Sequence, residues 1–255
     1  MASLNEVKEM KLIAHRGGSF GRENSLETII YAAKAGADLV ECDIRQTKDG
    51  EYVIFHDPNL LRLTGVDAEV SEITAAQMAQ ILESHGQKLL TFRALAEGYR
   101  EKAPILLHIK PTDYDEAFAK KIVDSGLPLV VGVVSLPMLE CFAKLLPREK
   151  ILAFLPEPAM AKEFFEAGAG IIRLWEHWLV DVTPDEIRAQ CPGAEVFIMA
   201  YCKEEMDDDF DLSSMDGSVE TLEKVTGLKA DGILLNNIDL ALQWKSCKIK
   251  TEQQK

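Results

Sequence analysis

Short apolar runs alternate with amphipathic segments along almost the whole chain. The runs have the length of strands, and the segments between them carry apolar residues at helical spacing. Apart from a short extra strand at 52–56, the pattern predicts eight strands, at 11–15, 38–44, 105–109, 129–135, 151–154, 171–175, 196–201 and 232–235. Helices are predicted at 25–35, 75–82, 91–102, 115–124, 137–146, 159–167, 184–190, 218–226 and 239–244.

The regular order of strand and helix predicts the fold class. Eight units in 255 residues give about 32 residues each, which is typical of a (β/α)₈ barrel. A doubly wound open sheet is the alternative, but residues 15–21 (HRGGSFG) lack the G-x-G-x-x-G spacing that such a sheet usually shows after its first strand. We therefore expect one α/β barrel domain over 1–255, with a long insertion at 45–90 after the second strand and a loose tail at 248–255.

Composition and charge exclude several classes of protein. A hydrophobic fraction of 47% and a charged fraction of 27% are ordinary for a soluble globular protein, and no segment approaches the ~18 apolar residues of a membrane span. The first residues lack the apolar core of a secretory signal, so we expect a cytoplasmic protein without stable membrane insertion. A net charge of −14 and a pI near 4.9 argue against nucleic acid as a partner. The five cysteines form no C-x-x-C pair, so no zinc knuckle or disulfide framework is predicted.

Two carboxylates share one face of the second predicted strand. Glu41 and Asp43 are spaced for the inside of the barrel, roughly 7 Å apart along the strand. Buried carboxylates so close repel each other unless a cation neutralises them. Binding of a divalent metal and an internal salt bridge to Lys110 or Arg16 both satisfy this requirement, and the two side chains alone do not decide between them.

Other ionisable residues follow neighbouring strands. His108 and Lys110 face inward on the strand at 105–109, His15 and Arg16 end the first strand, and His56 ends the extra strand. Because the active site of a barrel lies at the carboxyl ends of its strands, we expect all of them at one mouth. Arg16 and Lys110 suit an anionic phosphate, and two histidines suit proton transfer to and from it. Together these residues predict an enzyme that cleaves a phosphoester.

The stretch 12–65 resembles the glycerophosphodiester phosphodiesterase family. It contains, in order, the family's patterns His-Arg-Gly, Glu-Asn-Ser, Glu-x-Asp, Thr-Lys-Asp-Gly and His-Asp. The resemblance implies a TIM barrel and a metal-dependent hydrolase that releases an alcohol from a glycerophosphodiester and leaves glycerol phosphate. It also implies that a substrate hydroxyl attacks phosphorus first and that water then opens the cyclic phosphate.

The resemblance also implies roles for individual residues. His15 and His56 would be the acid/base pair, Arg16 a phosphate ligand, and Glu41 and Asp43 metal ligands. Lys110, which suits the phosphate by its charge, is expected to bind substrate as well.

The chain departs from the family at three of its strand ends, one of which reads Met199-Ala200-Tyr201-Cys202 where the family usually has Trp-Thr-Val-Asn. The third metal ligand is normally a Glu in a Glu-Ile-Lys strand, but this chain reads His108-Ile109-Lys110. With His108 as third ligand, we expect one divalent ion, Mg²⁺, Mn²⁺ or Ca²⁺, with the imidazole shifting preference from Ca²⁺ toward Mn²⁺ or Zn²⁺. The last strand ends in Asn236-Asn237 instead of the usual Thr-Asp.

Two other functions remain open from the sequence. One is a lyase-type enzyme, like some phospholipases D, that stops at the cyclic phosphate. The other is a barrel that binds a phosphorylated ligand without turnover, which the exchange at His108 keeps open. The oligomeric state cannot be inferred from the sequence.

Of the remaining polar residues, Asn24 is predicted to cap the first helix or bond to the strand-one loop, and the acidic run 204–211 is expected to be a solvated loop.

Overall fold

A closed barrel of parallel strands forms the centre of the computed structural model, which describes residues 7, 9–110, 114–201 and 215–253. The strands of this described part form one sheet in the order β1-β9-β8-β7-β6-β5-β4-β2-β3, and β1 also pairs with β2. Their bounds are β1 Lys11–Ala14, β2 Leu39–Gln46, β3 Tyr52–Ile54, β4 Ile105–Ile109, β5 Leu129–Val133, β6 Ile151–Phe154, β7 Ile171–Trp175, β8 Glu195–Met199 and β9 Gly232–Leu235. Only β3 pairs antiparallel among these, so the other eight strands close the predicted (β/α)₈ barrel.

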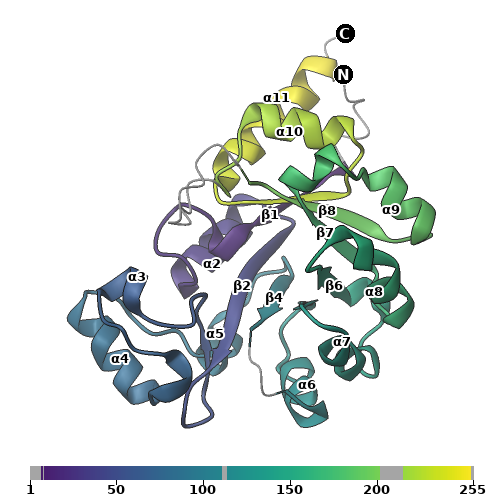
Figure 1. Ribbon diagram of the computed structural model, residues 1–255. Coiled ribbons are helices and arrows are strands. Elements are labelled where there is room, and N and C mark those ends of the chain that lie inside the picture. Colours follow the sequence, from purple (N-terminus) through teal and green to yellow (C-terminus); the bar gives the residue numbers. More distant parts are fainter. Residues whose placement is uncertain (1–6, 8, 111–113, 202–214, 254–255) are drawn as a thin grey trace.

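Helices surround the barrel, as Figure 1 shows. The α-helices are α2 Leu26–Ala35, α3 Leu61–Thr64, α4 Ala75–Ser84, α5 Phe92–Gly98, α6 Glu116–Val123, α7 Leu136–Ala143, α8 Ala161–Ala167, α9 Pro184–Gln190, α10 Val219–Gly227 and α11 Ile238–Gln253. Short 3₁₀ turns are η1 His15–Gly17, η2 Val70–Glu72, η3 Arg148–Lys150, η4 Pro158–Met160 and η5 Glu176–Val180. None of the described helices combines the length and apolar character needed to cross a membrane.

Two apolar layers hold the barrel together, and strand alternation separates them. On β2, Val40, Cys42 and Ile44 are buried in the outer layer, between the sheet and the helices. Leu39 lies in the inner layer inside the barrel, and Glu41 and Asp43 follow it on the same side of the strand. The same alternation therefore fills the bottom of the barrel with hydrocarbon and brings charge to its mouth.

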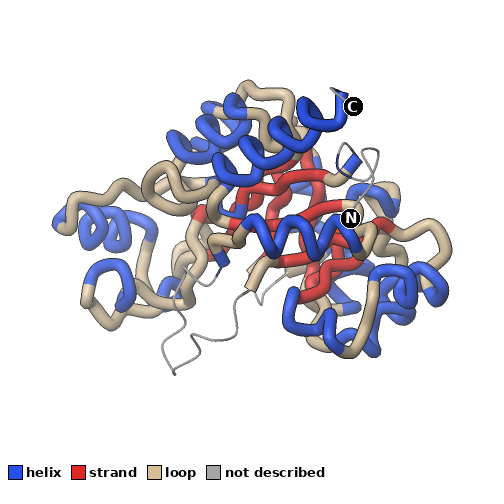
Figure 2. Tube along the Cα trace, turned by 90° about the horizontal axis from the view of Figure 1, so that it is seen from above, coloured by secondary structure: helices blue, strands red, loops and turns tan. Residues whose placement is uncertain are grey.

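The segment after β2 folds onto one side of the barrel. It contains β3, α3, η2 and α4, and the two helices stand out from the barrel in Figures 1 and 2. Its own apolar cluster includes Val53, Phe55, Leu60, Met78 and Leu82. The predicted insertion at 45–90 therefore has a small core, which fixes the loop that carries His56.

Several predicted element ends differ from the structure by a few residues, and two of the differences concern the site and the chain end. β1 ends at Ala14, because His15 begins the tight turn η1 and Arg16 takes a left-handed backbone with φ of 52°. The predicted loose tail is wrong for 248–253, since α11 continues to Gln253. Trp244 of α11 is buried in the outer layer, and the ammonium of Lys248 pairs with Glu223 of α10 at 2.6 Å, so the last turns are anchored. The acidic run 204–211 lies outside the described residues.

Candidate active site

Glu41 and Asp43 lie at the mouth of the barrel and are almost completely buried, with 1% and 0% of their surface exposed. The backbone N–H of Arg16 donates to Glu41 Oε2 at 2.8 Å, and the Asn24 amide donates to Asp43 Oδ2 at 3.1 Å. Glu41 Oε1 and Asp43 Oδ1 are buried and accept no hydrogen bond. One oxygen of each carboxylate is therefore held by a hydrogen bond, and the other accepts none.

His108 completes this arrangement from the neighbouring strand. β2 and β4 pair with Asp43 opposite His108, so the imidazole projects beside the carboxylates. His108 Nδ1 lies 3.2 Å from Asp43 Oδ1 and 3.6 Å from Glu41 Oε1. Ligands bound at about 2.1 Å to one ion lie roughly 3.0–3.5 Å from each other, so these spacings suit a shared divalent ion. The donor set of two carboxylates and an imidazole fits the metal expected from the sequence.

The ring of His108 is held flat against the ring of Phe154. The two centroids are 3.8 Å apart and the planes are inclined by 11°. Gly132 lies between these residues on β5, and a Cβ there would approach Phe154 to 2.4 Å. The absence of a side chain at Gly132 therefore makes room for the stack. Burial, followed by the charge of Lys110, lowers the pKa of His108 to about 3, so the imidazole is neutral and able to bind a metal.

The charges around the carboxylates act on them unequally. Burial and the nearby Asp43 raise the pKa of Glu41 to about 8. Burial also opposes ionisation of Asp43, but Lys110, His56 and His108 outweigh it and hold the pKa of Asp43 well below its usual range. Lys110 Nζ lies 3.4 Å from Asp43 Oδ1. Without a metal, the site is therefore electrostatically satisfied with Asp43 ionised and Glu41 protonated.

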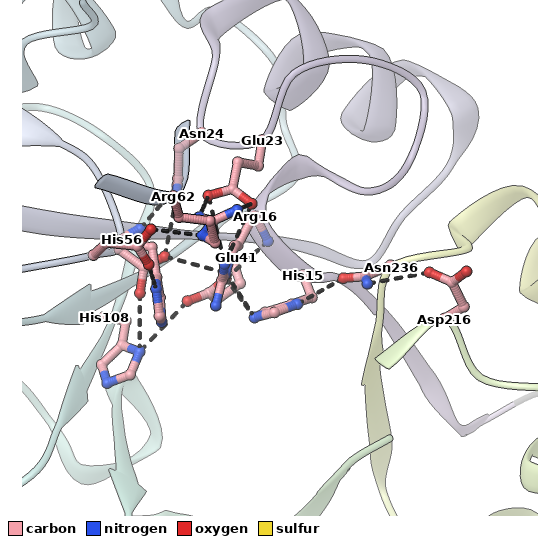
Figure 3. A network of polar contacts seen from close by, with 12 residues as sticks. His15, Arg16, Glu23, Asn24, Glu41, His56, Arg62, His108, Asp216 and Asn236 are labelled. Carbon is pink, nitrogen blue, oxygen red and sulfur yellow. Dashed lines mark hydrogen bonds and ion pairs between the residues drawn. The ribbon is translucent and has the colours of Figure 1, made fainter. Parts of the chain in front are cut away.

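His15 lies beside Glu41 and is fixed through both of its nitrogens. Arg16 Nε donates to His15 Nε2 at 3.2 Å, so the imidazole proton is on Nδ1 and donates to Asn236 Oδ1 at 2.7 Å. The Asn236 amide in turn donates to Asp216 Oδ1 at 3.1 Å (Figure 3). Burial and then Arg16 lower the pKa of His15 well below 6.5, so it is a neutral base with its lone pair on Nε2, 4.0 Å from Glu41 Oε2.

His56 is oriented by a carboxylate. His56 Nδ1 lies 2.7 Å from Asp57 Oδ1, and Arg62 Nε donates to Asp57 Oδ2 at 2.6 Å. Arg62 also donates to Glu23, which accepts from Arg16 Nη1 at 3.3 Å, so the loop after β1 and the insertion are joined (Figure 3). A carboxylate partner favours the imidazolium form, although burial lowers the pKa of His56 overall.

The structure brings together every residue that the sequence singled out for this mouth. Glu41, Asp43 and His108 converge with ligand atoms within 4.8 Å of one another. Asp43 acts electrostatically on both His15 and His56. Arg16 and Lys110 approach different oxygens of Asp43, with Arg16 Nε 3.8 Å from Oδ2 and Lys110 Nζ 3.4 Å from Oδ1.

Sequence reasoning missed several supporting residues. Asn236, Asp216 and Arg62 were not identified, although the departure at Asn236-Asn237 was a signal for the first. Asn24 does not cap α2, because the Ser25 side chain accepts from Thr28 N and is the cap. Its amide instead pairs with Asp43 twice, since the Asp43 backbone N–H also donates to Asn24 Oδ1 at 3.1 Å.

Part of the chain is similar in sequence to known proteins. Residues 15–135 match the sequence model of the Glycerophosphoryl diester phosphodiesterase family. Glycerophosphodiester phosphodiesterase 1 of Bos taurus is 32% identical over 139 residues, which are 50% of this chain and 42% of that protein. Lysophospholipase D GDPD1 of Homo sapiens is 33% identical over 102 residues, 39% of this chain and 32% of that protein. The chain thus matches less than half the length of these relatives.

Solved structures share the whole fold. A glycerophosphodiester phosphodiesterase from Thermotoga maritima superposes with a TM-score of 0.70 at 20% identity, covering 92% of this chain and 97% of that one. A phosphodiesterase from Oleispira antarctica, solved with the product sn-glycerol-3-phosphate, gives 0.63 at 20% identity, covering 96% and 97%. Residues 15–135 are thus similar in sequence to the glycerophosphodiester phosphodiesterase family, and the whole chain shares the fold of solved structures that carry that name.

Proposed function

We propose that the protein is a metal-dependent glycerophosphodiester phosphodiesterase that converts a small glycerophosphodiester to glycerol phosphate and an alcohol. The observation that carries this proposal is the juxtaposition of two oriented histidines with three converging metal-ligand atoms at one barrel mouth. The relatives' names and the product-bound neighbour support the same chemistry.

Glu41, Asp43 and His108 would hold one divalent ion. The ion would neutralise phosphate charge and lower the pKa of a bound hydroxyl. The imidazole at His108 favours Mn²⁺ or Zn²⁺ over Ca²⁺, whereas Mg²⁺ would need additional water ligands. Arg16 and Lys110 would contact the phosphate oxygens from either side of Asp43.

The hydrogen bonds suggest a division of labour between the histidines. His15 has an unprotonated Nε2, because Nδ1 donates to the neutral amide of Asn236. Once Arg16 Nε, which donates to this nitrogen, binds the phosphate instead, Nε2 would remove the proton of the attacking substrate hydroxyl. His56, paired with Asp57, would protonate the departing alcohol oxygen. The P–O bond to the alcohol breaks as the hydroxyl closes on phosphorus, and in a second step water opens the cyclic phosphate.

Paired variants test these roles. His15→Ala and His56→Ala should each lower kcat on an alkyl diester at least ~100-fold, with metal affinity and thermal stability retained. With p-nitrophenol as the leaving group, which needs no proton, His56→Ala should regain most of the rate and His15→Ala should not. His85→Ala, which changes an exposed histidine beyond α4, is the matched control.

The assay also separates the other candidate functions. Phosphorus NMR distinguishes glycerol phosphate from a cyclic phosphate, so a cyclic end product would indicate the lyase outcome. Restoration of activity by Mn²⁺ or Mg²⁺ after chelation would exclude a barrel that only binds its ligand. Normal rates in either histidine variant on the alkyl diester would contradict the assigned roles.

A further inference from the structure

Arg173 is a buried cation on the far side of the site from the carboxylates. It occupies the middle of β7, with only 4% of its surface exposed. Its neighbours in the strand pairing are Phe154 of β6 and Phe197 of β8, both part of the inner layer of the barrel. Arg173 therefore projects into the barrel, where the sequence analysis assigned it no function.

Among the described residues, the guanidinium of Arg173 lies over three aromatic rings. Its central carbon lies 4.5 Å from the Trp175 centroid, 5.2 Å from that of Phe154 and 5.5 Å from that of Trp178. Within the described part of the chain no carboxylate pairs with it, and its Nε and Nη1 atoms are buried without a hydrogen-bond partner. A buried charge with orphaned donors is costly, and aromatic faces supply only part of the compensation.

Arg173 is separated from the candidate metal ligands by a single ring. Phe154 stacks on His108 at 3.8 Å and meets Arg173 at 5.2 Å, so the guanidinium carbon and the His108 ring are no farther apart than these two distances combined. Trp178 belongs to η5, which follows the carboxyl end of β7, so the guanidinium reaches toward the mouth of the barrel. Burial lowers the pKa of Arg173 to about 9, and the group is therefore still charged at neutral pH.

We propose that Arg173 determines specificity by binding an anionic group on the alcohol part of the substrate, a carboxylate or a phosphate. This inference rests on the proposed diesterase function and names its substrate class. The reacting phosphate already has Arg16, Lys110 and the expected ion, so Arg173 is a further cation that can bind a second anion. Its aromatic neighbours would otherwise suit a trimethylammonium group, but the guanidinium occupies their faces and repels such a group.

A matched substrate series tests the proposal. Diesters of glycerol phosphate with 4-hydroxybutanoate, 1,4-butanediol and choline carry a negative, a neutral and a positive end. The wild type should show kcat/KM falling in that order. Arg173→Met should lower kcat/KM for the butanoate ester about 10–100-fold, the loss expected for a charge-assisted hydrogen bond, and change the butanediol ester less than about threefold. Arg173→Lys should keep part of the preference.

The control variant is Arg148→Met. Arg148 also lies over an aromatic ring, that of Phe165 at 4.2 Å, but it is exposed and outside the barrel. It should leave the substrate preference unchanged. Thermal melts of all variants show whether each one is folded.

A binding measurement makes the inference independent of turnover. Calorimetry with 4-hydroxybutanoate phosphate and with butyl phosphate should give a wild-type preference for the former that Arg173→Met abolishes. If the wild type cleaves none of the three esters but keeps this preference, the diesterase function fails and the anion site stands. If Arg173→Met lowers kcat/KM equally for all three esters, Arg173 acts on the reacting phosphate. If the variant is less stable to heat but keeps the wild-type preference for the butanoate ester, Arg173 serves packing. Either result overturns the proposal.

Discussion

Gly132 determines whether His108 can be held for metal binding, and Gly132→Ala tests this directly. A Cβ at this position would lie 2.4 Å from Cε2 and 2.9 Å from Cδ2 of Phe154, whereas ordinary contact begins at 3.4 Å. The ring must therefore retreat by about 1 Å in a closely packed barrel. Its stacking on His108, at 3.8 Å and 11°, cannot survive that shift.

The magnitude follows from two separate effects of Gly132→Ala. Overpacking of a core by one methyl group costs about 1–3 kcal/mol, which lowers the Tm of a chain of this size by about 2–12 °C. Loss of the contact that orients a ligating imidazole typically costs about 10–100-fold in metal affinity. We therefore expect lower stability and weaker Mn²⁺ binding in the same variant.

Thermal unfolding of the metal-free protein and calorimetric titration with Mn²⁺ measure these effects. Gly227→Ala is the control, because no atom lies within 4 Å of a Cβ added there. Adding Phe154→Leu to Gly132→Ala should restore stability by relieving the clash but leave Mn²⁺ binding weak, since the stacked ring is still missing. A Gly132→Ala protein that melts and binds Mn²⁺ like the Gly227→Ala control would refute this reasoning.

Three further predictions concern the groups around the carboxylates. Asn236→Ala removes the acceptor of the His15 Nδ1–H hydrogen bond and should lower kcat about 10–100-fold with little change in KM. Steady-state kinetics measures both constants, and a proportional rise in KM would contradict a purely orienting role for Asn236. The pKa of Glu41 is raised from 4.5 to about 8, so its contribution to the stability of the metal-free protein is present below pH 4.5 and is lost as the pH rises through 8. Mn²⁺ binding at pH 7 should therefore release about one proton, and its affinity should rise up to pH 8. Calorimetry in two buffers measures both effects, and an affinity that does not change with pH would refute the prediction. Arg62→Gln removes the hydrogen bond that holds Asp57 and should lower kcat about 3–10-fold. Because Arg62 is partly exposed, the free energy of unfolding should change by less than about 1 kcal/mol. A loss of stability without an effect on kcat would show that Arg62 has a structural role only.

The fold and the acidic pair could be predicted from the sequence because both depend on local periodicity. Alternation along β2 already placed Glu41 and Asp43 on the side opposite Val40 and Cys42, and the structure confirms that separation. Strand pairing then brings His108 beside Asp43, as expected for neighbouring parallel strands. What periodicity could not give is the conformation of the turn after β1, where Arg16 takes a left-handed backbone.

The supporting contacts depend on how the barrel closes, and that information is not local. His15 meets Asn236 because β1 pairs with β9, which places residues 221 positions apart side by side. Arg62 reaches Glu23 because the insertion folds back over the loop after β1. Neither contact leaves a spacing pattern in the chain, since each partner lies in a separate polar loop. Arg173 was missed for a different reason, because a single charged residue in an apolar strand does not form a periodic pattern of polar positions.

The sequence left open whether the acidic pair serves a metal or an internal salt bridge, and the hydrogen bonds bear on that choice. A salt bridge that satisfied the pair would neutralise both carboxylates, but among the described residues no lysine or arginine pairs with Glu41, and Glu41 Oε1 is buried without a hydrogen-bond partner. Lys110 and Arg16 approach Asp43 at 3.4 and 3.8 Å, so they offset part of its charge without closing the site. The cations thus lower the repulsion between the carboxylates, while ligand atoms of Glu41, Asp43 and the neutral His108 lie within 4.8 Å of one another. This division of the oxygens supports the metal proposal over a salt bridge, because a self-sufficient ion pair gains nothing from leaving buried acceptors unsatisfied.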